Sequence, residues 1–395
     1  MGILLLIVGL VLFIGLILVH EWGHFVAARR SGVVVEEYGI FFPPRLYKKR
    51  MKGGWDFTIN LLPLGGFVKM KGEHDSDTEA GSFGAASLKA KSLIMAAGIL
   101  MNLVVAYVLF VILAIAGMPH LVANQYTVRT DTTYLSHARY VTNVDTVEKG
   151  SPAARIGLKS DDVITALGPT GHVQRLTGQD QMPALTTRYS GQTVTVRFKH
   201  DGRTLSRQVS LRSDADIAAA ARHGKTIGRL GVTTYVTQKG LTVARSTWSA
   251  PIVAAGVMVQ FTALTFQGLG HALAGLGGIV AGAFTHNTTA RQAAQTEASN
   301  QVSGPIGVFF IFKYGAALGL RFILMVVALL SLTLGIMNLL PIPALDGGRL
   351  WITLIAHGIK RPLSARREEL ISLYGFLVLF ALIILISFVD IKRFF

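Results

Sequence analysis

The sequence contains no cysteine among its 395 residues. Disulfide bonds and thiolate metal ligands are therefore excluded, and any bound metal must use histidine and carboxylate side chains. Charged residues are also scarce, at 15% of the chain, whereas hydrophobic residues make up 51%. This composition is more apolar than that of a soluble protein, and it predicts a protein that resides in the lipid bilayer.

Acidic residues are fewer than basic ones, 22 against 38, which gives a formal net charge of +16. We predict no nucleic-acid partner, because most of the basic excess flanks apolar runs, where it marks the cytoplasmic side of a membrane. The segment between the first two runs is the richest in such residues: Arg29, Arg30, Arg45, Lys48, Lys49, Arg50, Lys52, Lys69, Lys71, Lys89 and Lys91.

Four apolar runs are long enough to cross roughly 30 Å of hydrocarbon, at residues 2–28, 93–117, 322–345 and 370–389. The first run lacks a basic start and a small-residue cleavage site, so we interpret it as a retained helix. The fold class is thus a mainly α-helical membrane protein with about four transmembrane helices.

A fifth apolar segment, 249–284, is interrupted by Gln260, Gln267 and His271. A single crossing there would reverse the third run, so we predict an interfacial or amphipathic helix pair, followed by a loop at 285–303.

The polar stretch 125–236 alternates apolar and polar residues, as in Thr193-Val194-Thr195-Val196-Arg197-Phe198, and carries turn residues such as Asp201-Gly202. This pattern predicts a small β-rich domain between the second and third runs.

The strongest chemical signal is the sequence His20-Glu21-Trp22-Gly23-His24 at the end of the first run. Histidines at positions i and i+4 share one helix face and can bind one Zn²⁺, while the glutamate handles protons. Chance alone produces this motif in roughly one chain in a hundred of this length. Ionisable groups inside a membrane helix are costly and mark function, which favours the zinc interpretation.

A catalytic zinc site takes three protein ligands, so one is missing. Asp346 follows the third run in Asn338-Leu339-Leu340-Pro341-Ile342-Pro343-Ala344-Leu345-Asp346-Gly347-Gly348, where two prolines break the helix. We predict that Asp346 is the third ligand. The alternative is that it caps the helix that follows.

The two motifs together, HEWGH and NxxPxPxLDGG, resemble the site-2 protease family of intramembrane zinc metalloproteases, and the chain is most similar to its bacterial RseP/RasP-like branch. The resemblance implies four parts: residues 1–118 with two transmembrane helices and a membrane-associated β-hairpin, a PDZ-like extracytoplasmic domain at 119–240, an interfacial helical segment at 241–303, and the last two transmembrane helices at 304–395.

Smaller matches assign further residues by resemblance. Gly65, Gly66 and Phe67 resemble the hairpin that pairs with extended substrate, although an ordinary surface hairpin would look alike. The residues 150–164 resemble a PDZ signature in which Asp161 replaces the usual glycine. Asn338 matches an asparagine associated with substrate binding. Asn102, on the second run, is interpreted as a helix-to-helix hydrogen-bonding residue.

The expected activity is hydrolysis of a peptide bond in or beside the transmembrane segment of a single-span membrane protein, with Glu21 as general base. By resemblance, the substrates are anti-sigma factors already trimmed by an upstream site-1-type protease, or signal-peptide remnants. The expected location is the inner or plasma membrane, multi-pass, with the active site towards the cytoplasm. The alternatives are a metal-ion transporter or an inactive PDZ scaffold.

Overall fold

The computed structural model describes residues 2–73, 77–136, 139–178, 180–284, 305–359 and 364–394. The chain forms two compact units, one of Met1–Tyr134 with Ala244–Phe395 and one of Leu135–Val243. The short strands β4 (Thr133–Ser136) and β11 (Thr242–Arg245) lie where the chain passes between the units, and β3 (Met118–Pro119) precedes them. The predicted loop 285–303 lies outside the described residues.

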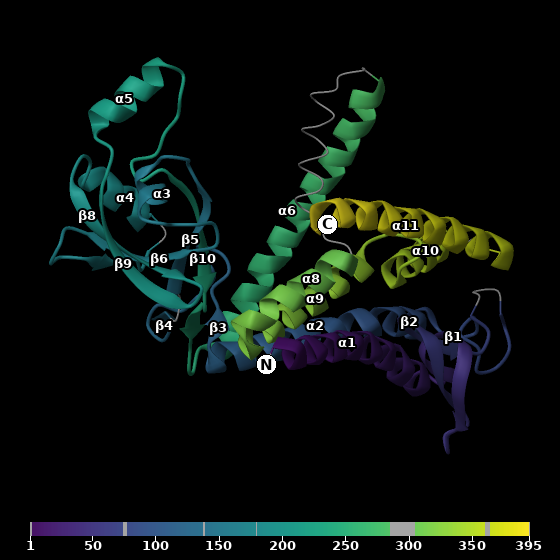
Figure 1. Ribbon diagram of the computed structural model, residues 1–395. Coiled ribbons are helices and arrows are strands. Elements are labelled where there is room, and N and C mark those ends of the chain that lie inside the picture. Colours follow the sequence, from purple (N-terminus) through teal and green to yellow (C-terminus); the bar gives the residue numbers. More distant parts are fainter. Residues whose placement is uncertain are drawn as a thin grey trace. The chain divides into compact units, whose positions relative to one another are not determined.

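The first unit is built on three long helices, α1 (Gly2–Arg30), α2 (Leu88–Ala116) and α9 (Leu320–Leu339), which lie side by side (Figure 1). Helix α2 packs on both of the others. A Cβ atom on Gly23 would lie 2.6 Å from the carbonyl oxygen of Ala97, so glycine is what lets α1 approach α2. This contact brings the end of α1 that carries the HExxH motif against α2.

Four helices among the described residues are long and apolar enough to cross a membrane: α1, α2, α9 and residues Ala250–Gly275 of α6. Three of these helices coincide with predicted runs, and the fourth, α6, lies in the segment predicted as interfacial. The predicted span 370–389 forms part of one helix, α11 (Ala365–Phe394). The protein is an integral membrane protein with a mixed helical and sheet structure.

The prediction of a helix pair at 249–284 is wrong, because α6 (Ala250–Phe284) is one continuous helix. Pro251 lies in its first turn, where a missing N–H costs little. Gln260, which interrupts the apolar run, is satisfied by the backbone of another segment: its Oε1 accepts from Tyr126 N at 2.8 Å and its Nε2 donates to Asn124 O at 2.8 Å. The polar side chain therefore does not break the helix.

Two long strands, β1 (Val35–Arg50) and β2 (Asp56–Met70), form the hairpin that follows α1 (Figure 1). Both are bent, so that residues 35–40 pair with residues 66–70 on one side, and residues 37–40 also pair with residues 56–59 on the other. Residues 66–70 thus form an outer edge of this sheet, and β1 is their only pairing partner among the described strands. Tyr38 ties the sheet to α1 by donating from its hydroxyl to Leu18 O at 2.8 Å.

Two shorter helices and a 3-10 turn flank α9 in the sequence. Helix α8 (Pro305–Gly315) and the 3-10 turn η1 (Ala316–Leu318) precede α9, and α10 (Asp346–Gly358) follows it. Residues 340–345 between α9 and α10 are not helical. The prolines of this segment produce the predicted break.

The second unit has its own core and a sheet of strand order β10-β5-β6-β8-β9, with β7 beside β6. Val144, Leu167, Val194, Val196 and Phe198 are fully buried in the core. Its strands are β5 (Arg139–Val147), β6 (Val163–Gly168), β7 (Gln174–Arg175), β8 (Thr193–His200), β9 (Arg203–Ser210) and β10 (Val232–Lys239), and its helices are α3 (Pro152–Arg155), α4 (Gln181–Arg188) and α5 (Asp214–Arg222).

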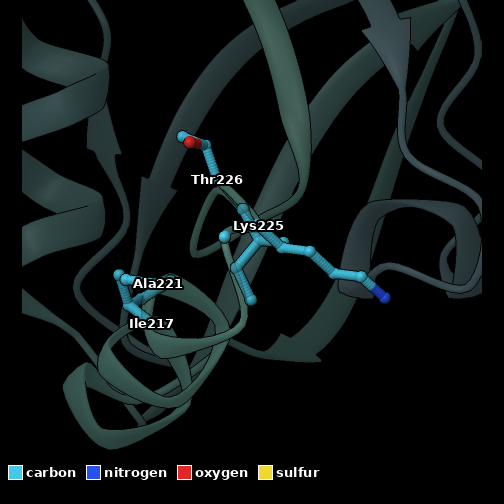
Figure 2. A pocket seen from close by; sticks show the side chains of 6 residues that line it. Ile217, Ala221, Lys225 and Thr226 are labelled. Carbon is cyan, nitrogen blue, oxygen red and sulfur yellow. The ribbon is translucent and has the colours of Figure 1, made fainter.

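A β-rich insert is thus present, while its assignment as a PDZ domain stays a prediction. Asp161 has a φ of 68°, the left-handed conformation in which aspartate replaces the usual glycine at modest cost. A shallow pocket beside α5 is lined by Ile217, Ala221, Gly224, Lys225, Thr226 and Ile227 (Figure 2). Its lining carries none of the predicted site residues.

Candidate metal centre

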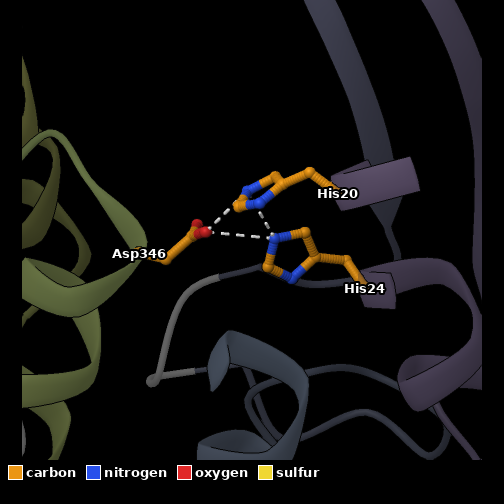
Figure 3. Close-up of side chains that lie close together, drawn as sticks. All are labelled: His20, His24 and Asp346. Atoms are coloured by element: carbon orange, nitrogen blue, oxygen red, sulfur yellow. Dashed lines mark hydrogen bonds and ion pairs between the residues drawn. The ribbon is translucent and has the colours of Figure 1, made fainter. Parts of the chain in front are cut away.

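Three side chains from the two motifs meet at one point of the first unit (Figure 3). The Asp346 Oδ2 atom lies 2.9 Å from His20 Nε2 and 3.1 Å from His24 Nε2, and the two Nε2 atoms are 3.3 Å apart. The sequence predicts this set of three, and the structure brings it together from positions more than 320 residues apart.

The ring of His24 is held by the backbone of α2. Its Nδ1 atom lies 2.8 Å from Ile94 O, in a buried contact, and must donate a proton to that carbonyl. The Nε2 atom is then left with a free lone pair directed at Asp346 and His20. A histidine fixed in this way is prepared to bind a metal through Nε2.

Helix α2 passes so close to the two histidines that only glycine fits beneath them. A Cβ atom on Gly98 would lie 2.3 Å from His24 Nε2 and 2.6 Å from His20 Cε1. The absence of a side chain at Gly98 leaves the space that both histidine rings occupy.

Asp346 is the first residue of α10, and Leu345 occupies the capping position without a side-chain capping bond. The carboxylate instead faces the two histidines, which contradicts the capping alternative. Gly347 and Gly348 allow α10 to fold back on the chain before it, because added Cβ atoms would lie 2.5 Å from Asn338 O and 2.1 Å from Ile342 O.

The three ligand atoms fit zinc. Nitrogen and oxygen ligands about 2.0–2.1 Å from a tetrahedral zinc lie about 3.3 Å from each other, close to the separations found here. Two imidazoles and one carboxylate form a set typical of catalytic zinc, which leaves a fourth position open. The side chains of His20 and His24 are 12% and 10% exposed, and that of Asp346 is 29% exposed.

The side chain of Glu21 lies beside the edge of the hairpin sheet. An added Cβ atom on Gly66 would lie 3.1 Å from Glu21 Cγ, which places the outer segment 66–70 against the helix turn that carries the metal ligands. The predicted substrate-pairing residues therefore lie beside the predicted general base.

The other predicted substrate residues contribute to this arrangement in different ways. Phe67 stacks on Phe42, with ring centroids 6.1 Å apart, and the space above Gly65 is closed by the same Phe42 ring. Asn338 lies in the last turn of α9, and its carbonyl oxygen faces Gly347.

Sequence reasoning missed the contact between Asn102 and His20. The Asn102 side-chain amide lies 3.2 Å from His20 Nδ1, and its buried Oδ1 atom has no hydrogen-bond partner among the described residues. Asn102 follows Gly98 by four residues and so shares its helix face, but the sequence alone gives no sign that this face meets the histidines.

The comparisons with known proteins cover nearly the whole chain. A model of peptidase family M50 matches residues 8–382. A Clostridium perfringens protein named as a zinc metalloprotease is 28% identical, with 98% of each chain covered. An Enterococcus faecalis protein named as the protease eep is 23% identical over 96% of this chain and 97% of its own. A zinc metalloprotease by name from Campylobacter jejuni is 26% identical over 96% and 90%.

Proposed function

Because the chain belongs to peptidase family M50, the site-2 proteases, we propose that this zinc metalloprotease cleaves single-span membrane proteins within or beside their transmembrane segments. The cluster of His20, His24 and Asp346 carries the proposal. It lies at the ends of helices α1 and α9, both of which are apolar and long enough to cross a membrane. Protein substrates that reach such a site are themselves in the bilayer.

The side chains of the site have separate proposed roles in metal binding, proton transfer and substrate binding. His20 and His24 through Nε2, and Asp346 through Oδ2, hold the metal, which when bound supplies Lewis-acid activation of water and of the peptide carbonyl. Glu21 takes a proton from the attacking water at its carboxylate and delivers it to the leaving amine. Asn338 is proposed to assist substrate binding next to Gly347.

A substrate helix hides its carbonyls in its own hydrogen bonds, so it must unwind before it is cut. The outer segment 66–70 pairs with no strand other than β1 among the described residues, and Gly66 lies beside Glu21. An unwound substrate that adds as a strand there would have its backbone satisfied and its peptide bond held near the base. Gly65, Gly66 and Phe67 are the proposed pairing residues.

The basic segment between α1 and α2 supports an active site open to the cytoplasm, and the second unit would then lie outside the membrane on the opposite side. In this arrangement the second unit excludes proteins with large outer domains. The proposed substrates are therefore proteins first trimmed by another protease, such as anti-sigma factors, or remnants of signal peptides.

The test is to map the cut in a purified single-span substrate whose outer domain has been truncated. We expect a zinc-dependent cut inside or at the cytoplasmic boundary of the apolar segment, lost with a chelator and restored by zinc. A cut confined to polar regions far from the membrane would contradict the proposal. Matched substrates with an intact outer domain should be cut far more slowly.

A further inference from the structure

The side chain of Asn102 is buried in α2, 1% exposed, with two polar atoms to satisfy. The Nδ2 atom lies 3.2 Å from His20 Nδ1, while Oδ1 has no hydrogen-bond partner in the part of the chain that the structure describes. A buried amide oxygen without a partner is costly. The two ends of the amide exchange places by a half-turn of the side chain, so either atom can face His20.

The chemistry of His20 decides which end faces it. Its Nε2 atom points to Asp346 and to His24, and it must lack a proton to bind a metal. The proton of the neutral ring is then on Nδ1, which needs an acceptor. Nδ2 cannot accept, whereas Oδ1 can.

We propose that Asn102 is a positioning residue, which accepts the Nδ1 proton of His20 through Oδ1 and so fixes the ring with Nε2 towards zinc. This arrangement satisfies the buried Oδ1 atom and the His20 Nδ1–H together. It rests on the proposed role of His20 as a zinc ligand.

The backbone of Asn102 is itself anchored. Ser331 of α9 donates from Oγ to Asn102 O at 2.8 Å in a buried hydrogen bond. Ile94, Gly98 and Asn102 follow each other at intervals of four residues, so they share one face of α2. Along this face Ile94 O holds His24, Gly98 makes room for both rings, and Asn102 orients His20.

The opposite interpretation is that Asn102 only joins helices. It predicts that any side chain of similar size keeps zinc binding intact. The positioning role predicts that zinc binding needs the acceptor oxygen. Asn102→Leu should therefore weaken zinc binding and Asn102→Asp should preserve it, because a carboxylate oxygen accepts the ring proton of many zinc-bound histidines.

The experiment compares Asn102→Leu, Asn102→Asp and Ser331→Ala with the intact full-length protein in detergent. Zinc affinity is measured by competition with a chelator, and the unfolding temperature of each metal-free protein is measured separately. Ser331→Ala is the matched control, because it removes a buried hydrogen bond between the same helices without touching His20.

We expect Asn102→Leu to weaken zinc binding by about 10- to 100-fold, Asn102→Asp to retain affinity within about fivefold, and Ser331→Ala within about twofold. Asn102→Ala replaces the Leu variant if that variant does not fold. Unchanged zinc affinity in Asn102→Leu would overturn the inference. Equal losses of zinc affinity in Asn102→Leu, Asn102→Asp and Ser331→Ala would overturn it as well. Absence of zinc binding by the intact protein would overturn the metal site as well, which separates the two failures.

Discussion

At the scale of single residues, the metal site depends on the absence of a side chain as much as on the ligands. Gly98 lies under both histidine rings, and His24 cannot withdraw easily because Ile94 O holds its Nδ1 atom. A methyl group on Gly98 would therefore displace the ligand atoms themselves.

We predict that Gly98→Ala weakens zinc binding by about 10- to 100-fold, with a matching loss of proteolysis. Gly15→Ala in α1 is the control, because an added Cβ atom there meets nothing within 4 Å. The control should bind zinc normally and be as stable as the intact protein or slightly more so. Equal zinc affinity in Gly98→Ala and Gly15→Ala, measured by chelator competition, would show that zinc binding does not require the absence of a side chain at position 98.

The residues of the candidate metal site were predictable because spacing and chemistry are local properties. His20 and His24 lie one helical turn apart, and without cysteine Asp346 was the natural donor after a broken apolar run. The roles of Asn102 and Ile94 were not predictable, because they depend on the register in which α2 packs against α1, which no local pattern encodes.

At the scale of elements, the hairpin sheet presents its outer segment 66–70 to the turn of α1 that carries Glu21. Only glycine at position 66 leaves this contact uncrowded, since an added Cβ atom would also lie 3.3 Å from Gly39 O. A larger side chain would move either the edge segment or the base.

We therefore expect Gly66→Val to lower the cleavage rate roughly 10- to 100-fold while zinc affinity is unchanged, because misplacing the base affects chemistry without touching the ligands. Leu61→Ala, at a 53% exposed position of the same strand, should leave both properties unchanged. If Gly66→Val cleaves at the normal rate, the outer segment does not position substrate or base.

Helix α6 illustrates why elements are harder to predict than ligands. Gln260 interrupts the apolar run and so argued against a membrane span, but its partners Asn124 and Tyr126 lie about 135 residues earlier in the chain. The start of α6 is likewise fixed from afar: Asp131 accepts from the backbone N–H groups of Thr247 and Ser249 and from both hydroxyls.

Partial desolvation raises the pKa of Asp131, but these hydrogen bonds outweigh it and lower the pKa from 3.8 to about 2. Because the folded pKa is the lower one, the carboxylate stabilises the fold above about pH 4, and this stabilisation is lost as the pH falls through about 2. Asp131→Asn should therefore lower the unfolding temperature at pH 7, and the difference from the intact protein should shrink below pH 4.

The matched control for this prediction is Asp180→Asn, since Asp180 starts α4 without a side-chain capping bond. It should have little effect at any pH. A difference between Asp131→Asn and the intact protein that stays constant from pH 7 to pH 2.5, in thermal unfolding, would contradict the assignment.

At the scale of the whole molecule, the metal site constrains how the chain crosses the membrane. His20 and His24 are near the end of α1 and Asp346 follows the end of α9, so both helices end on the same side. If α6 crosses the membrane once, a return crossing is needed before Leu320. The apolar residues of α8 and η1 lie in that interval.

The absence of cysteine makes the proposed topology directly testable. Single cysteines replace Lys49 in the basic hairpin and Arg203 in the second unit, both exposed. A membrane-impermeant thiol reagent added outside intact cells should label the Arg203→Cys protein and not the Lys49→Cys protein until the membrane is opened. Labelling of both from the same side would contradict the proposed topology.

We propose that Glu21 acts as general base in a zinc-dependent cleavage of membrane-embedded substrates. A comparison of the intact protein with Glu21→Gln, on a single-span substrate with a truncated outer domain and at equal zinc occupancy, tests this role. We expect Glu21→Gln to bind zinc normally and to cleave about 10²- to 10⁴-fold more slowly. Cleavage at the normal rate by Glu21→Gln, with zinc bound, would contradict it.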